Sequence, residues 1–392
     1  MSLYRREILP QGLLLPLSLV STLLLLLTFF SAMRPEAFWW LFSSDALYLP
    51  AMYRDWFIDG RGIQGWHFNP SPNFLPDMPV YFILMWITGG NIIASTSLYG
   101  ILQYAAIILL FHQIVMRYSD TRTARRITAL GNLLLALLLI SPIREGFLFL
   151  GFYLLINAYH SSVLLFGMAG FLLFQDFVLR GGFWRLGILF LMTLLAVVSD
   201  QINLVTVVFP IAGTSALSFR LPFPRRRMLM AGAAALLAGS GGLWAFRELN
   251  TLTTIHFDLP HKIFLYEEMW IAGRRMLVDL YEVINDANLD SVLVLGALSA
   301  LLLTFAAALR SVFRGKGSEI WALYWIFAAF FSAGVLAAPV INGNYSSFDC
   351  LRYNIYPLYL GLLNLPFLLH RRRWFRGNPG QFAFAGLLGL VL

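Results

Sequence analysis

The chain has 392 residues, of which 59% are hydrophobic and only 12% are charged, and its formal net charge is +8. This composition excludes an ordinary soluble domain and is typical of a polytopic membrane protein. The single cysteine excludes an intrachain disulfide bond and a thiolate metal cluster.

Apolar segments of about 20 residues can cross the roughly 30 Å hydrocarbon layer of a membrane. The sequence predicts an all-α polytopic bundle of about ten spans, with a partial eleventh at 381–392, in a single integral-membrane domain over residues 1–392. The predicted spans are 13–32, 93–116, 127–141, 160–177, 186–198, 203–219, 228–246, 291–309, 320–341 and 355–369.

Basic residues cluster in the short loops on the side that also holds the N-terminus, so the positive-inside rule makes that side cytoplasmic. These residues are distributed a few per loop and are not concentrated on one helix face, which argues against nucleic acid as a partner. We expect a multi-pass protein of a bacterial inner (plasma) membrane, in contact with membrane lipids.

The first outer loop spans residues 33–92 and ends in an apolar piece, Pro79 to Gly90. As a helix this piece would extend only about 18 Å, which is too short to cross the membrane. We therefore expect re-entrant or interfacial helices in this loop. This choice fixes the direction of every later span.

The fourth outer loop, residues 250–290, has apolar residues near helical spacing with charged residues between them. The apolar residues are Ile263, Tyr266, Trp270, Leu277, Tyr281 and Ile284. This pattern predicts an amphipathic helix along the outer membrane surface. A helix that packs over the bundle, or one that forms a lid over a substrate, would give a similar pattern.

Two aspartates of the first loop are candidate catalytic residues. Asp45 follows the aromatic run 38–40, which suits the headgroup level, where a carboxylate can stay ionised and accept a proton from a hydroxyl group. Asp77 lies between Pro76 and Pro79, which restrict the backbone around it. Either aspartate could instead cap a helix.

Several other residues at the outer side are candidate substrate ligands. Arg352 offers a planar guanidinium that suits a lipid-linked phosphate, with Tyr353 beside it, although an arginine at a membrane edge can also simply snorkel. The remaining candidates are His67, His160, Arg54 and Asp200. For these the alternatives are loop packing for His67, a solvated ion pair for Arg54 and helix capping for Asp200.

One anchor is followed by a long outer loop with SSDALYLPAMYRDW and FLPDMPVYF, and later by HSSVLL at the fourth span and LRYNIYPLYLGLL near the end of the chain. In this order of features the chain resembles the GT-C superfamily of membrane glycosyltransferases. The resemblance implies transfer of a sugar from a polyprenyl-phosphate donor to a glycan, lipid or protein acceptor on the periplasmic face. Asp45 would match the catalytic aspartate and Arg352 the contact to the donor phosphate.

The chain lacks the WWDYG sequence and the second-loop acidic pair of oligosaccharyltransferases. No clear motif therefore supports a divalent metal, and no cofactor is assigned. The alternative functions are a carrier or flippase for a lipid-linked sugar and a non-catalytic membrane scaffold. A coupled carrier usually places ionisable groups in mid-membrane, whereas the candidates in this sequence fall at the outer edge.

Overall fold

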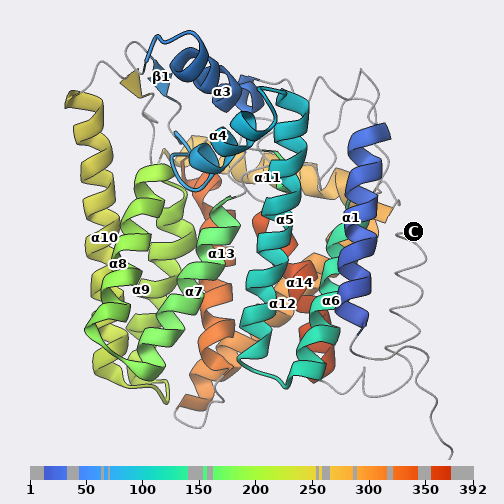
Figure 1. Cartoon of the computed structure of the whole chain (residues 1–392). Helices are drawn as coiled ribbons and strands as arrows, with labels where there is room; N and C mark the ends of the chain where they lie inside the picture. Colours follow the sequence, from blue (N-terminus) through green and yellow to red (C-terminus); the bar gives the residue numbers. More distant parts are fainter. Residues whose placement is uncertain are drawn as a thin grey trace, which may run out of the picture.

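The computed structural model describes residues 13–32, 44–62, 66–68, 71–139, 153–156, 162–252, 256–257, 265–285, 289–315, 321–342 and 355–371. Within these residues the chain forms a bundle of long helices with shorter helices at one end (Figure 1).

A helical segment lies at each of the ten predicted spans. These are α1 (Leu14–Ala32), α5 (Ile92–Met116), α6 (Thr121–Leu137), α7 (Ser162–Arg180), α8 (Phe183–Ser199), η3 (Leu204–Val208) continuing into α9 (Phe209–Ala216) and η4 (Leu217–Phe219), α10 (Arg225–Leu252), α12 (Leu289–Arg314), α13 (Ala322–Ile341) and α14 (Tyr356–Arg371).

Among the described residues, 5 helices are long and apolar enough to cross a membrane, namely α5, α7, α10, α12 and α13. The protein is therefore a membrane-embedded helical bundle. Shorter apolar helices lie at Leu14–Thr28, Phe183–Ser199 and Leu204–Phe219. That these shorter helices also cross the membrane, for a total of about ten spans, stays a prediction.

Contacts at the two ends of α7 establish which loops lie together. Ser162, at the start of α7, contacts the first outer loop, whereas Asp176, near its end, contacts Arg117 and Arg185 from the basic loops. At about 1.5 Å per residue, some 21 Å of helix separate Ser162 from Asp176. The first loop and these basic loops therefore lie at opposite ends of the bundle, as expected if residues 79–90 do not cross.

Hydrogen bonds inside the bundle hold α1 against its neighbours. The side-chain amide of Asn132 in α6 donates to the backbone oxygen of Ser18 at 3.0 Å and to the hydroxyl of Thr22 at 2.9 Å. The hydroxyl of Tyr104 in α5 donates to the backbone oxygen of Asn132 at 3.1 Å. Buried polar contacts of this kind fix helix pairs in an apolar surrounding.

The first outer loop folds into a layer over one end of the bundle (Figure 1). It contains α3 (Ser44–Tyr53), the π-helical turn η1 (Arg54–Ile58), the short strand β1 (His67–Phe68) and α4 (Asp77–Ile87). This first-loop layer has its own hydrophobic core, which also includes residues of α5 and α10. The buried members of this core are Tyr48, Leu49, Met52, Phe68, Met78, Tyr81, Leu84, Met85, Tyr99 and Phe246.

The chain reverses direction between α4 and α5. Gly89 and Gly90 adopt φ values of +63° and +84°, which side chains disfavour, and the side chain of Asn91 accepts a hydrogen bond from the Ala94 backbone at 3.0 Å. α4 therefore folds back beside the start of α5.

The fourth outer loop contributes β2 (His256–Phe257) and α11 (Tyr266–Asn285). β2 pairs in parallel with β1, with His67 opposite His256 and Phe68 opposite Phe257. The two outer loops are thus joined directly through their backbones.

α11 runs across the bundle, not along it (Figure 1). Its buried residues are Ala272 and Asp279, whereas the predicted apolar stripe is largely exposed, with Trp270 at 64% and Leu277 at 65%. Leu280, Val283 and Ile284 are partly buried against the bundle core, so α11 packs on the bundle through the side that carries these residues, while the other large apolar side chains of its stripe stay exposed. Contact of those side chains with the membrane surface stays a prediction.

Candidate functional site

The segment from Ser71 to Asp77 is fastened to the end of α8. Ser199 exchanges two hydrogen bonds with Leu75: its hydroxyl donates to the Leu75 oxygen at 2.7 Å and accepts from the Leu75 nitrogen at 2.8 Å. The backbone nitrogen of Asn73 donates to the Ser199 oxygen at 3.0 Å. One serine at the end of a bundle helix therefore fixes the backbone that leads into α4.

Asp200 makes a further link between the same two segments. Its carboxylate oxygen Oδ1 accepts hydrogen bonds from the hydroxyl of Ser71 at 2.8 Å and from the backbone nitrogen of Ile202 at 3.0 Å. Asp200 is only 1% exposed. Its bond to Ile202 orders the turn after α8, close to the capping role that the sequence left open.

The turn after Asp200 leads into the π-helical segment η3 through Asn203, which is fully buried. The Asn203 amide donates to the backbone oxygens of Ala196 and Asp200 at 3.0 and 3.1 Å, and its oxygen accepts from Thr206 at 3.0 Å. Wide helical turns of this type recur at functional sites because they redirect side chains.

Asp77 lies in the first turn of α4 and is fully buried. Oδ1 accepts a hydrogen bond from the Tyr99 hydroxyl of α5, and Oδ2 accepts one from the Ser162 hydroxyl of α7 at 3.1 Å. The carboxylate thus joins the first-loop layer to two bundle helices. Its position is fixed by protein donors, as a rigidly placed functional group requires.

The partners of Asp77 are held in turn. The Tyr99 hydroxyl also lies 2.7 Å from the Gln103 side-chain oxygen, and the Gln103 amide donates to the backbone oxygen of Leu154 at 2.7 Å. A Cβ at Gly100 would lie 2.6 Å from the Leu155 oxygen, so only glycine permits this close approach. The segment 153–156 is therefore part of the support for Asp77.

A second tyrosine fastens α4 to α5. The hydroxyls of Tyr81 and Thr96 lie 3.0 Å apart, and both residues are buried. Burial raises the pKa of Tyr81 to about 12, since ionisation in a dry surrounding is unfavourable, although the hydrogen bond to Thr96 acts in the opposite direction.

Arg54 forms an exposed ion pair with Asp59, with Nε 3.5 Å from Oδ2, and Arg61 pairs with Asp55 at 3.7 Å. These contacts agree with the interpretation of the charges as solvated pairs. A substrate role for Arg54 stays a prediction.

The other candidates are described only in part. The backbone of Asp45 belongs to α3 and that of His67 to β1, and both side chains lie outside the described residues. His160, Arg352 and Tyr353 lie wholly outside them.

Of the sequence candidates, the described side chains therefore bring together Asp77 and Asp200, through the segment 71–77. Among the described residues, no group of three or more His, Cys, Asp or Glu side chains could hold a metal ion.

Several residues of the site were not singled out from the sequence. Ser71, Tyr99, Gln103 and Ser162 each donate to or orient a candidate acid or its partner. Tyr99 and Gln103 did carry a signal, because polar side chains within an apolar span are costly unless they are paired. Ser71 carried none, since serines are common in loops.

No family model, curated protein or solved structure matches this chain.

Proposed function

We propose that the protein is a membrane glycosyltransferase that moves a sugar from a polyprenyl-phosphate donor to an acceptor at the first-loop end of the bundle. One observation carries the proposal. The first-loop layer is packed on its own core and is fastened to α5, α7 and α8 by hydrogen bonds of Asp77, Ser199 and Asp200.

An enzyme that takes a lipid-linked donor must hold polar groups in fixed positions at the membrane edge while the lipid part of the donor stays in the bilayer. A first-loop layer that is rigidly attached to the bundle can provide this. The order of sequence features that resembles the GT-C superfamily supports the same conclusion. The described acids of the site belong to the loop end, and none lies at mid-bundle, which favours a transferase over a coupled carrier.

In the proposed reaction, an acceptor hydroxyl attacks the anomeric carbon of the donor sugar. The bond from that carbon to the phosphate oxygen breaks, and the electron pair leaves with the lipid phosphate. Asp45 takes the hydroxyl proton as general base, and Arg352 with Tyr353 steadies the departing phosphate.

Buried acids have a different task in this proposal. Asp77 and Asp200 already accept hydrogen bonds from protein hydroxyls, so we assign them to positioning the loop segment between them. His67, His160 and Arg54 would then contribute to the sugar site from the outer side.

The test uses the purified full chain and an undecaprenyl-phosphate monosaccharide labelled in the sugar, with a membrane extract as the source of acceptor. Asp45→Asn should lower transfer of label from the donor by about 100-fold or more, the usual contribution of a general base. Asp55→Asn is the matched control, because it removes an acid of the same loop that pairs with the exposed Arg61. It should transfer label at the wild-type rate.

A folded Asp45→Asn protein with full transfer would refute the assignment of the base. If the wild-type protein instead carried intact donor across a sealed vesicle without cleaving it, the carrier function would replace the transferase.

A further inference from the structure

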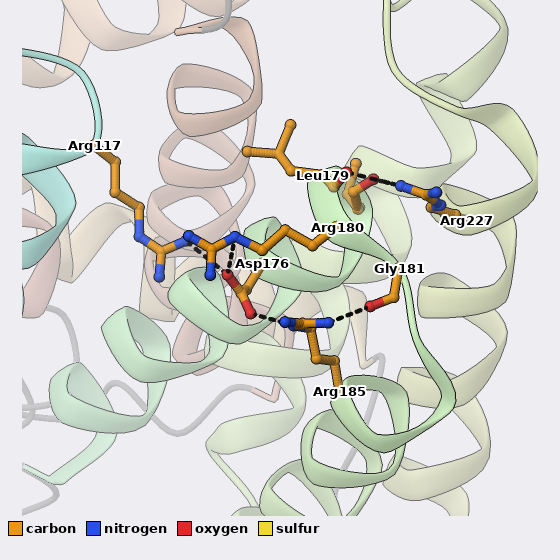
Figure 2. Close-up of polar contacts among 8 residues, drawn as sticks. Arg117, Asp176, Leu179, Arg180, Gly181, Arg185 and Arg227 are labelled. Carbon is orange, nitrogen blue, oxygen red and sulfur yellow. Dashed lines mark hydrogen bonds and ion pairs between the residues drawn. The ribbon is translucent and has the colours of Figure 1, made fainter.

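Arginines from three elements converge on one carboxylate at the end of the bundle opposite to the candidate site. Arg185 at the start of α8 places Nε 2.7 Å from Oδ2 of Asp176, and Arg180 at the end of α7 places Nε 3.3 Å from Oδ1. Arg117, which follows α5, approaches Oδ1 at 3.7 Å. Figure 2 shows the three side chains pointing toward Asp176 from different directions.

A fourth arginine lies beside this group. Arg227 of α10 donates to the backbone oxygens of Leu179 and Val178 at 2.8 and 3.3 Å, so its partners carry no formal charge (Figure 2). The three guanidinium groups that meet Asp176 form an arginine cluster with a formal surplus of +2, and Arg227 adds a charge on the neighbouring helix. A surplus of this kind attracts an anion.

The cluster keeps donors available for such an anion. Arg180 meets Asp176 through Nε, and its side chain is 67% exposed, so it remains accessible to a ligand. Arg185 also uses Nε for Asp176 and one terminal group for the Gly181 oxygen at 3.0 Å. Guanidinium groups bind phosphate oxygens in a forked geometry, and several together bind more tightly than one.

Two exposed aromatic residues select a lipid as the source of the phosphate. Phe183 and Trp184 lie between Arg180 and Arg185 in sequence, and they are 90% and 78% exposed. Exposed aromatic rings beside arginines are typical of the level of the lipid headgroups. A phosphate bound to the cluster would therefore lie at the depth where phospholipid headgroups lie.

We propose that Arg117, Arg180 and Arg185 form a binding site for the phosphate of an anionic phospholipid in the leaflet at this end of the bundle. Asp176 holds the three guanidinium groups together, and the phosphate balances the positive charge that the single carboxylate does not neutralise. The site lies about 21 Å along α7 from Ser162 and does not depend on the proposed transferase function.

The test measures how much phosphatidylglycerol and phosphatidylcholine of the same acyl length the purified full chain retains, by native mass spectrometry. The double substitution Arg117→Gln and Arg180→Gln should reduce the preference for phosphatidylglycerol about tenfold or more. The matched control is Arg225→Gln with Arg226→Gln, which removes the same charge from exposed residues at the same end. It should change the preference less than twofold.

Equal losses in the two double variants would overturn the proposal, because the effect would then be one of general charge. Should the first variant fail to fold, the single Arg180→Gln substitution carries the test, since that side chain is largely exposed.

Asp176→Asn separates lipid binding from a merely structural role. It keeps one oxygen that can accept hydrogen bonds from the guanidinium groups but removes the negative charge that competes with a phosphate, so retention of phosphatidylglycerol should rise even if thermal stability falls. A fall in stability with no change in lipid preference would contradict the proposal. Inorganic phosphate at the same concentration should be retained less than phosphatidylglycerol by the wild-type protein, and equal or greater retention would refute the lipid assignment in favour of a soluble phosphate.

Discussion

Replacing Asp77 by alanine should destabilise the protein more than any conservative change at the same position. The fully buried carboxylate accepts hydrogen bonds from Tyr99 and Ser162, and alanine would leave both hydroxyls without this partner. Loss of a buried partner costs about 1–3 kcal/mol for each group. We therefore expect Asp77→Ala to lower the free energy of unfolding by about 2–5 kcal/mol.

Two further variants show whether that loss comes from the hydrogen bonds. Asp77→Asn keeps the shape and one acceptor oxygen, so it should cost about 1 kcal/mol, and Ser162→Ala should cost a similar amount. The measurement is reversible unfolding of the detergent-solubilised protein, with a double-mutant cycle between positions 77 and 162. A coupling energy near zero, or an alanine variant as stable as the wild type, would refute the reasoning.

Three other predictions concern the packing around the site and in the bundle. Gly100→Ala should shift α5 away from Leu155 and lower the melting temperature, because the new Cβ would lie 2.6 Å from a backbone oxygen, and Gly187→Ala, where no atom lies within 4 Å, serves as its control. Asn132→Ala should lower the free energy of unfolding by about 1–2 kcal/mol, because α1 loses two hydrogen bonds. Thr22→Ala removes only one of the two, so a loss as large as that of Asn132→Ala would contradict this account. The free energy of unfolding should fall as pH rises from 10 toward about 12, because Tyr81 ionises in the unfolded chain at a lower pH than in the folded protein. When unfolding is measured against pH, this fall should be about 3 kcal/mol smaller in Tyr81→Phe.

The positions of the long helices could be predicted from the sequence because an apolar span must hydrogen-bond its own backbone within the bilayer. The segment 79–90 was predicted to be too short to cross the membrane. The structure has a helix there, α4, that ends at Ile87 before the turn at Gly89, and its place at the membrane surface stays a prediction. Charge distribution likewise predicted that Arg117 and Arg185 lie at one end, where both meet Asp176.

The candidate site was harder to predict because its hydrogen bonds join residues that are far apart in sequence. Ser71 and Asp200 are separated by 129 positions, and Asp77 and Ser162 by 85. Nothing in the local pattern around a loop serine indicates which helix end it meets. For α11 the helical period could be predicted, but not that Ala272 and Asp279 would face the bundle while Trp270 stays exposed, because both faces carry apolar residues.

The parallel pairing of β1 with β2 also constrains how this protein can be altered. Phe68 and Phe257 come from loops almost two hundred positions apart, yet they lie opposite each other in the same two-stranded sheet. Replacing one loop with a foreign segment would remove one strand of this pair and leave the other strand without its partner. Chimaeras of these loops should therefore exchange both segments together.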